Sequence, residues 1–302
     1  MKIMNFSSFQ QIIDHARNRG KCFLSVAAAQ DKDVLKSVQE AVEQNLIVPI
    51  LSGDGEQIKR YAADLDFNLA GIEIIDEPDP YEASLRAVEQ VSNGCAQILM
   101  KGSVNSNAFL KAVLDKQVGL RTGKLLSHLA IVEVPSFTRL LFVTDGGINI
   151  APDLNQKVVI LENSVAFMNK LGYVEPKVAV LSANEVVIPQ MASTEEGAML
   201  SKMAERKQLK NCIVDGPLSL DLAISLKSVA MKGIDSKVAG QAQLLLAPNI
   251  ESGNIFCKAL VYFAKAEFAG VVLGARAPIV MTSRSDSSRS KIASIAIASL
   301  GR

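Results

Sequence analysis

The sequence has few of the residues on which common catalytic sites depend. It holds only two histidines, His15 and His128, and no G-x-S-x-G segment, which argues against a hydrolase with a Ser-His-Asp triad. Its 32 lysine and arginine residues nearly balance its 31 aspartate and glutamate residues. No net field therefore favours nucleic acid or an anionic membrane surface, and an anionic ligand must be held by a local group of residues.

Cysteine is also scarce. Cys22, Cys95, Cys212 and Cys257 stand far apart, form no C-x-x-C pair and lie in or beside apolar stretches. This spacing predicts buried, reduced thiols and argues against a disulfide framework or a metal site.

Several longer signatures are missing as well. No G-x-x-x-x-G-K-[ST] segment occurs and no G-x-G-x-x-G follows an apolar run, which weakens the case for a nucleotide hydrolase or an ordinary dehydrogenase. Polar residues interrupt the first twenty positions, unlike a secretory signal or a membrane span. We therefore predict a cytoplasmic protein.

What the sequence does contain is a regular alternation of short apolar runs with longer segments of helical period, which predicts an α/β fold with a largely parallel sheet. The expected strands are 21–27, 46–52, 72–75, 97–101, 129–134, 140–144, 178–181, 212–214, 243–247, 271–273 and 279–282. The expected helices are 31–44, 54–65, 80–92, 105–116, 153–171, 194–207, 219–227, 253–265 and 287–300. Asp54, Asp79 and Asp153 occupy N-cap positions, and Pro80 suits the first position of a helix.

The alternation of strands and helices is interrupted near residue 127, where two expected strands follow one another. The connection of five residues between them suggests an antiparallel pair. With 302 residues, two domains are the better expectation. We place residues 1–126 with 279–302 in a first α/β domain and residues 127–278 in a second.

The most informative segment is Pro278–Arg289, where an apolar strand ends in hydroxyls, an arginine and a carboxylate directly before a helix. The free N–H groups at a helix start attract anions, and Arg284 could add a planar fork for phosphate. The alternative is that Ser285 or Asp286 only caps the helix and that Arg284 is a surface residue.

Three further segments follow apolar strands. Ala247–Asn254 opens a helix and offers the amides of Asn249 and Asn254 and the close-approach position Gly253, although, taken alone, an ordinary strand-to-helix turn is the better explanation. Leu99–Ser106 places Lys101 and Gly102 at a strand end that would suit phosphate. The turns at Thr144–Gly147 and at Asp215–Asp221 contain carboxylates, and a structural role is the default for both.

Taken in order, these segments resemble the phosphate acetyl/butyryltransferases over most of the chain. The blocks that carry the resemblance are Val143–Gly146, Lys177–Ser182, Asp215–Gly216 with Asp221, Ala223 and Ile224, Pro248–Asn249 with Gly253–Asn254, and Pro278–Arg284. Met100–Gly102, Gly119–His128 and the compact length look like the butyryl branch.

The resemblance implies the two-domain isocitrate/isopropylmalate dehydrogenase-like fold with an interdomain cleft, a homodimer, and transfer of a short-chain acyl group between CoA and inorganic phosphate. It implies CoA and acyl-CoA as substrates, with no permanently bound cofactor, no metal, no nucleic acid and no membrane partner. The family's active-site Ser-Arg pair falls on Ser283 and Arg284. The acetyl branch has a catalytic aspartate where this chain has Ser290, so Asp286 is its substitute in this prediction.

The implied substrate-binding residues are Lys101, Gly102, Thr144, Asn249, Gly253 and Asn254. Two alternatives stay open. One is a relative that uses NAD and a divalent metal, which would need Asp145, Asp215 and Asp221 to cluster. The other is a two-domain protein that binds CoA or another anion without turnover.

Overall fold

The structure is a computed structural model that describes residues 6–282 and 286–302. Contacts divide the chain into two compact units. The flanking unit consists of residues 9–124 and 269–302, and the central unit of residues 6–8 and 125–268. The predicted domain boundaries differ from this grouping in residues 6–8, in residues 125–126 and in residues 269–278.

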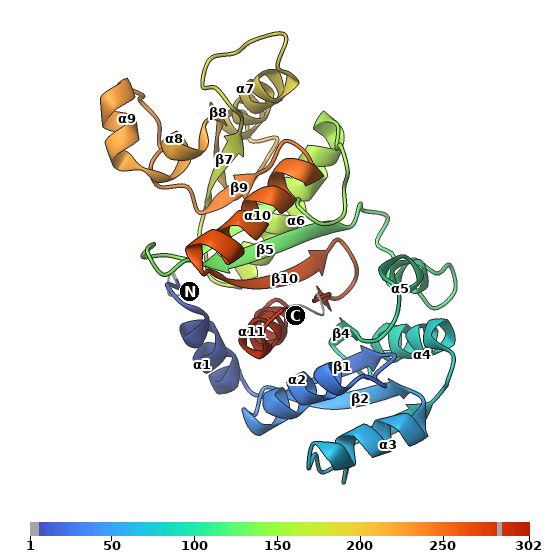
Figure 1. Ribbon diagram of the computed structural model, residues 1–302. Coiled ribbons are helices and arrows are strands. Elements are labelled where there is room, and N and C mark those ends of the chain that lie inside the picture. Colours follow the sequence, from blue (N-terminus) through green and yellow to red (C-terminus); the bar gives the residue numbers. More distant parts are fainter. Residues whose placement is uncertain (1–5, 283–285) are drawn as a thin grey trace. The chain divides into compact units, whose positions relative to one another are not determined.

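The flanking unit is built on parallel strands in the order β3-β2-β1-β4-β11, with β10 antiparallel to β11 at one side. These strands are β1 (Cys22–Ala27), β2 (Ile47–Gly53), β3 (Glu73–Asp76), β4 (Ile98–Lys101), β10 (Glu267–Leu273) and β11 (Ile279–Val280). The helices of this unit are α1 (Phe9–Arg19), α2 (Lys32–Glu43), α3 (Gly55–Asp64), α4 (Pro80–Ser92), α5 (Ser106–Val113) and α11 (Ser288–Leu300). Figure 1 shows α11 packed beside α1 and α2.

Side-chain caps fix where these helices begin. The carboxylates of Asp54 and Asp79 accept hydrogen bonds from backbone N–H groups of α3 and α4, as predicted, and Pro80 follows Asp79 at the start of α4. Helix α5 ends before its predicted end at 116. The reason is that Val118 and Gln117 donate their N–H groups to Asp115, which stabilises a turn and lowers the pKa of that carboxyl.

The central unit has the strand order β5-β6-β9-β7-β8. Strands β5 (Ser127–Glu133) and β6 (Leu141–Thr144) form the predicted antiparallel pair, and the other neighbours are parallel. The remaining strands are β7 (Lys177–Leu181), β8 (Ile213–Leu218) and β9 (Leu244–Leu246). The helices are α6 (Leu154–Lys170), α7 (Ala192–Glu205), α8 (Leu220–Ile224), α9 (Leu226–Lys232) and α10 (Ile250–Ala264).

Two helices of the central unit differ from expectation. The single helix predicted over 219–227 is divided at Ser225, whose backbone is extended and whose hydroxyl accepts the N–H of Ser228 to cap α9. Helix α10 begins at Ile250 rather than 253, because Asn249 and Ser252 form a reciprocal capping box. The extra turn places Gly253 inside the helix.

A buried aliphatic core holds the central sheet to its helices, with Val132, Val143 and Leu245 from three strands and Leu222 from α8 among its members. Burying such side chains contributes about 1.5–3 kcal/mol each. Within residues 6–282 and 286–302, no helix is long and apolar enough to cross a membrane.

Candidate active site

The first group of predicted site residues lies at one edge of the flanking sheet. Strands β1, β4 and β11 are adjacent and parallel, so their carboxyl ends meet at the same edge. The register pairs Val280, the last residue of β11, with Met100 of β4. Lys101, the last residue of β4, therefore lies level with the exit of β11. Asp286 lies in the connection that leaves this edge and enters α11. Ser283 and Arg284 lie outside the described residues.

Lys101 and Gly102 shape the turn that follows β4. The ammonium of Lys101 donates to the carbonyl oxygens of Gly102 at 3.2 Å and Val104 at 2.9 Å. The N–H of Gly102 donates to the oxygen of Ala27, and a Cβ at residue 102 would lie 2.4 Å from the oxygens of Ala27 and Ala28. Only glycine fits there. Both residues therefore have structural tasks, and their contact with substrate stays a prediction.

The cap of α11 is Ser287 rather than Asp286, and Ser285 lies outside the described residues. The hydroxyl oxygen of Ser287 accepts the N–H of Ser290 at 3.1 Å, and the two hydroxyls lie 3.0 Å apart. Ser290, at the position where the acetyl branch has an aspartate, is 4% exposed. Asp286 is thus not used as the cap of this helix, and its predicted part in proton transfer stays a prediction.

The second group lies in the central unit, where β6 ends in a tight turn. Asp145 is buried and its carboxylate accepts from four donors: the N–H groups of His128, Gly147 and Ile148 and the amide of Asn149, at 2.6–3.0 Å. Such a carboxylate fixes the path of the turn. The Thr144 hydroxyl is fully buried and donates to the oxygen of His128.

The start of α10 packs directly on that turn. A Cβ on Gly253 would lie 2.9 Å from the Cα of Gly146, and the side-chain amide of Asn254 donates to the oxygen of Gly146 at 3.1 Å. The structure therefore brings Thr144, Gly253 and Asn254 together. Asn249, one turn earlier, uses its side-chain oxygen to accept the N–H of Ser252.

Burial raises the pKa of three of the four thiols, those of Cys22, Cys212 and Cys257. Burial raises the pKa of Cys257 to about 12, and burial together with Glu175 raises the pKa of Cys212 to about 11. A thiol with a raised pKa is a poor nucleophile near neutral pH. Cys95, by contrast, is exposed.

The carboxylates that a metal-dependent dehydrogenase would need are engaged locally. Asp215 accepts the N–H of Gly216 and the hydroxyl of Ser236, and Asp221 accepts the hydroxyl of Ser219. Among the described residues, no three histidine, cysteine, aspartate or glutamate side chains are grouped as metal ligands would be.

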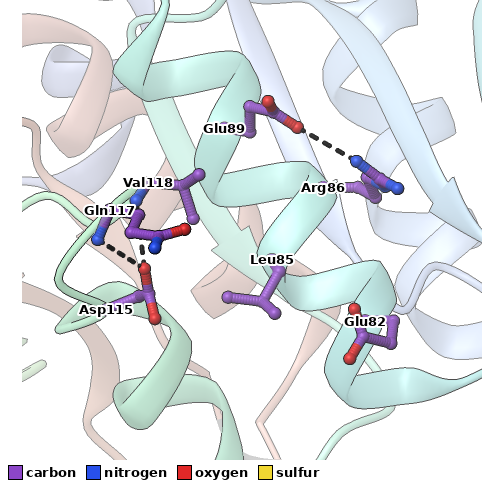
Figure 2. Close-up of a pocket in the computed structure, with 7 residues that line it drawn as sticks. All are labelled: Glu82, Leu85, Arg86, Glu89, Asp115, Gln117 and Val118. Atoms are coloured by element: carbon purple, nitrogen blue, oxygen red, sulfur yellow. Dashed lines mark hydrogen bonds and ion pairs between the residues drawn. The ribbon is translucent and has the colours of Figure 1, made fainter.

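A small pocket lies between α4 and the turn after α5 (Figure 2). Its lining residues are Glu82, Leu85, Arg86, Glu89, Asp115, Gln117 and Val118. The Arg86 guanidinium already pairs with Glu89 at 3.4 Å, and three carboxylates line the pocket. This pocket does not suit an anion and holds none of the predicted site residues.

Lys291, which the sequence reasoning missed, lies on the first turn of α11 and is 6% exposed. Its signal was a single charge at the start of an otherwise small and apolar helical segment, Ser290–Leu300.

Comparisons with known proteins agree with one another. Residues 79–299 match the family described as Phosphate acetyl/butaryl transferase. A phosphate butyryltransferase of Clostridium acetobutylicum is 45% identical over 97% of both chains, and a phosphate acetyltransferase of Thermotoga maritima is 44% identical over 96% of this chain and 98% of its own. The crystal structure of a branched-chain phosphotransacylase from Enterococcus faecalis V583 is 31% identical with a TM-score of 0.80, covering 92% of this chain and 99% of that one. The chain belongs to the phosphate acetyl/butyryltransferase family.

Proposed function

We propose that this protein is a phosphate acyltransferase that catalyses acyl-CoA plus phosphate to acyl phosphate plus CoA. The observation that carries the proposal is the 45% identity to a phosphate butyryltransferase across 97% of both chains. Family membership over nearly the whole chain makes this reading much stronger than either alternative. The dehydrogenase reading also needs a cluster of aspartates, and the three candidates are bonded to neighbouring groups in their own turns.

The thioester substrate and the acyl phosphate product are both activated, so the protein mainly has to orient two anionic substrates and stabilise one oxyanion. A phosphate oxygen attacks the thioester carbonyl carbon and forms the new C–O bond. As the tetrahedral intermediate collapses, the C–S bond breaks, and its electron pair leaves on the CoA sulfur, which takes up the proton that phosphate gives up. Positioning of this kind supplies several kcal/mol, and each donor aimed at the oxyanion roughly 3–4 kcal/mol.

We assign anion binding to Arg284 and the N-terminus of α11. Ser283 donates a hydrogen bond to the thioester, and Asp286 transfers the proton. The position of Asp286 between β11 and the capped start of α11 supports this assignment, as does Lys101 at the same sheet edge. The raised pKa values of Cys212 and Cys257 favour direct attack over an acyl-cysteine intermediate.

An Arg284→Ala substitution tests the assignment. If Arg284 meets charge in the transition state, turnover falls by at least about a hundredfold. Unchanged kinetics in a folded variant remove Arg284 from the site, and an acylated cysteine found by mass spectrometry after incubation with acyl-CoA contradicts direct attack.

The acyl group we propose is short, with butyryl as the preferred substrate, on the basis of residues 100–102 and 119–128. One methylene changes specificity by only about 1–3 kcal/mol, so relatives named for acetyl and for butyryl can be almost equally similar to this chain. Initial rates with acetyl-, propionyl-, butyryl- and branched acyl-CoA, followed by free thiol, decide the preference.

The finer structural predictions belong to the same proposal: the isocitrate/isopropylmalate dehydrogenase-like fold with its cleft, a cytoplasmic homodimer, and CoA as a substrate with no permanent cofactor. The mostly parallel sheet of each unit, with one antiparallel neighbour, supports the fold assignment. Sedimentation analysis of the purified protein tests the dimer, since a monomer at assay concentration contradicts it.

A further inference from the structure

Two lysines are buried among the residues that the structure describes, and they differ in their partners. Lys157 of α6 is 4% exposed and forms an ion pair with Glu196 of α7. Lys291 of α11 is 6% exposed, yet its ammonium forms no hydrogen bond or ion pair with any residue of 6–282 or 286–302. Burying a charge without a partner is unfavourable. A largely enclosed ammonium that lacks a partner among the described residues is available to pair with an anion.

A carboxylate of the neighbouring helix α2 contacts another residue of α11. Glu40 of α2 accepts the hydroxyl of Ser288. Ser294, on another side of α11, accepts the N–H of Gly270 in β10. A step of three residues along an α-helix rotates the side-chain direction by about −60°. Lys291 comes three residues after Ser288 and three before Ser294, so its side chain leaves the helix between these two contact faces.

The position of Lys291 on the helix also indicates where its ammonium extends. Its N–H donates to the oxygen of Ser287, which places it at the end of the first turn. Long side chains on a helix lean back toward the helix N-terminus. The ammonium of Lys291 is thus expected beside the first turn, where the helix dipole already favours an anion and where the connection from β11 arrives.

We propose that Lys291 is a further substrate-binding residue, whose ammonium pairs with the phosphate group of inorganic phosphate or of the acyl phosphate at the start of α11. This inference rests on the proposed phosphate acyltransferase function. The two observations that carry it are the low exposure of the Lys291 side chain, whose ammonium has no partner among the described residues, and its place on the first turn of the helix that enters from the predicted site edge. A lysine that only fills space in the core is the competing explanation.

Substitution separates the two explanations. Lys291→Met keeps the length of the side chain and removes its charge, while Lys291→Arg keeps the charge. We expect Lys291→Met to raise the KM for phosphate at least about tenfold, since a charged hydrogen bond is lost, and to change the KM for acyl-CoA by less than about twofold. Lys291→Arg should recover part of the loss. Lys36→Met, at an exposed position of α2, is the matched control and should leave both constants unchanged.

A KM for phosphate that is unchanged in folded Lys291→Met overturns the proposal. So does an equal rise of both KM values, because that result indicates a general distortion of the site. Circular dichroism and thermal unfolding verify that each variant is folded.

A labelling experiment on the wild-type chain keeps the test independent of folding and of turnover. The protein is reductively methylated with and without inorganic phosphate, with sodium chloride matching the ionic strength, and dimethyl-lysine is quantified by peptide mass spectrometry. We expect phosphate to slow the labelling of Lys291 several-fold and to leave Lys36 unaffected. Equal labelling of Lys291 in both conditions, or no labelling in either, overturns the proposal. Because this experiment needs no acyl-CoA, it distinguishes a failure here from a failure of the proposed reaction.

Discussion

The turn after β4 offers the sharpest test of how the candidate site is built. A Cβ added to Gly102 would lie 2.4 Å from two backbone oxygens, those of Ala27 and Ala28, whereas real Cβ contacts are essentially never below 3.0 Å. The turn or the end of β1 must therefore move by at least about 0.6 Å in Gly102→Ala. No flexible side chain is available to yield instead. Overpacking of this kind costs about 1–3 kcal/mol.

Thermal and urea unfolding of Gly102→Ala measure that cost. We expect a Tm lower by about 2–10 °C, from the usual shift of a few degrees per kcal/mol for a unit of this size. The same movement displaces Lys101, so kcat/KM should fall as well. Gly55→Ala is the matched control, because its Cβ would meet only the Asp76 side chain, at 3.1 Å. Wild-type stability in Gly102→Ala would refute the close packing described for this edge.

Three further predictions concern the central unit and its turns. Replacing Asn249 by alanine removes the cap of α10 and should lower the free energy of unfolding by about 1 kcal/mol in urea titrations, and a variant as stable as wild type would contradict the capping box. Asp145→Ala leaves four donors without their shared acceptor and should cost more than about 3 kcal/mol, whereas a loss below about 1 kcal/mol would show that the turn does not depend on the carboxylate. Burial raises the pKa of Cys257 from 9.0 to about 12, so the folded state holds its thiol proton more tightly than the unfolded state, and stability should decline as pH rises from about 9 toward 12. Cys257→Ala should remove that part of the alkaline decline, and identical pH profiles for the two proteins would contradict it.

The fold could be predicted largely from local signals. Asp54 and Asp79 stand at the starts of amphipathic segments, and each caps the helix that follows it. The five-residue connection between Val134 and Leu140 is too short for a crossover helix, so the antiparallel pair of β5 and β6 followed directly.

The misses arose where one side chain changed a boundary. Asn249 and Ser252 bond to each other's backbone and start α10 three residues early, and Ser225 interrupts the predicted helix 219–227 by capping a new one. A search for reciprocal caps would have found the first of these. Lys291 was missed for a different reason: the sequence shows a single charge at the start of a small and apolar helical segment, but its burial depends on tertiary packing.

The structure locates the described residues of the predicted site, and their roles stay predictions. Sequence reasoning named residues that the fold groups in two places, Lys101 with Gly102 and Asp286 in the flanking unit, and Thr144 with Gly253 and Asn254 in the central unit. Sequence reasoning could not show that the Thr144 hydroxyl donates its hydrogen bond to the backbone oxygen of His128. Such pairings follow from the register of neighbouring strands, which composition and spacing do not reveal.

The most direct test of the account is the phosphate dependence of thiol release by the purified protein. With butyryl-CoA, free thiol should appear only when inorganic phosphate is present, in equal amount to the acyl phosphate formed, and the rate should saturate with both substrates. Butyryl-CoA that stays intact with phosphate, together with the other short acyl-CoAs, would contradict the proposed function.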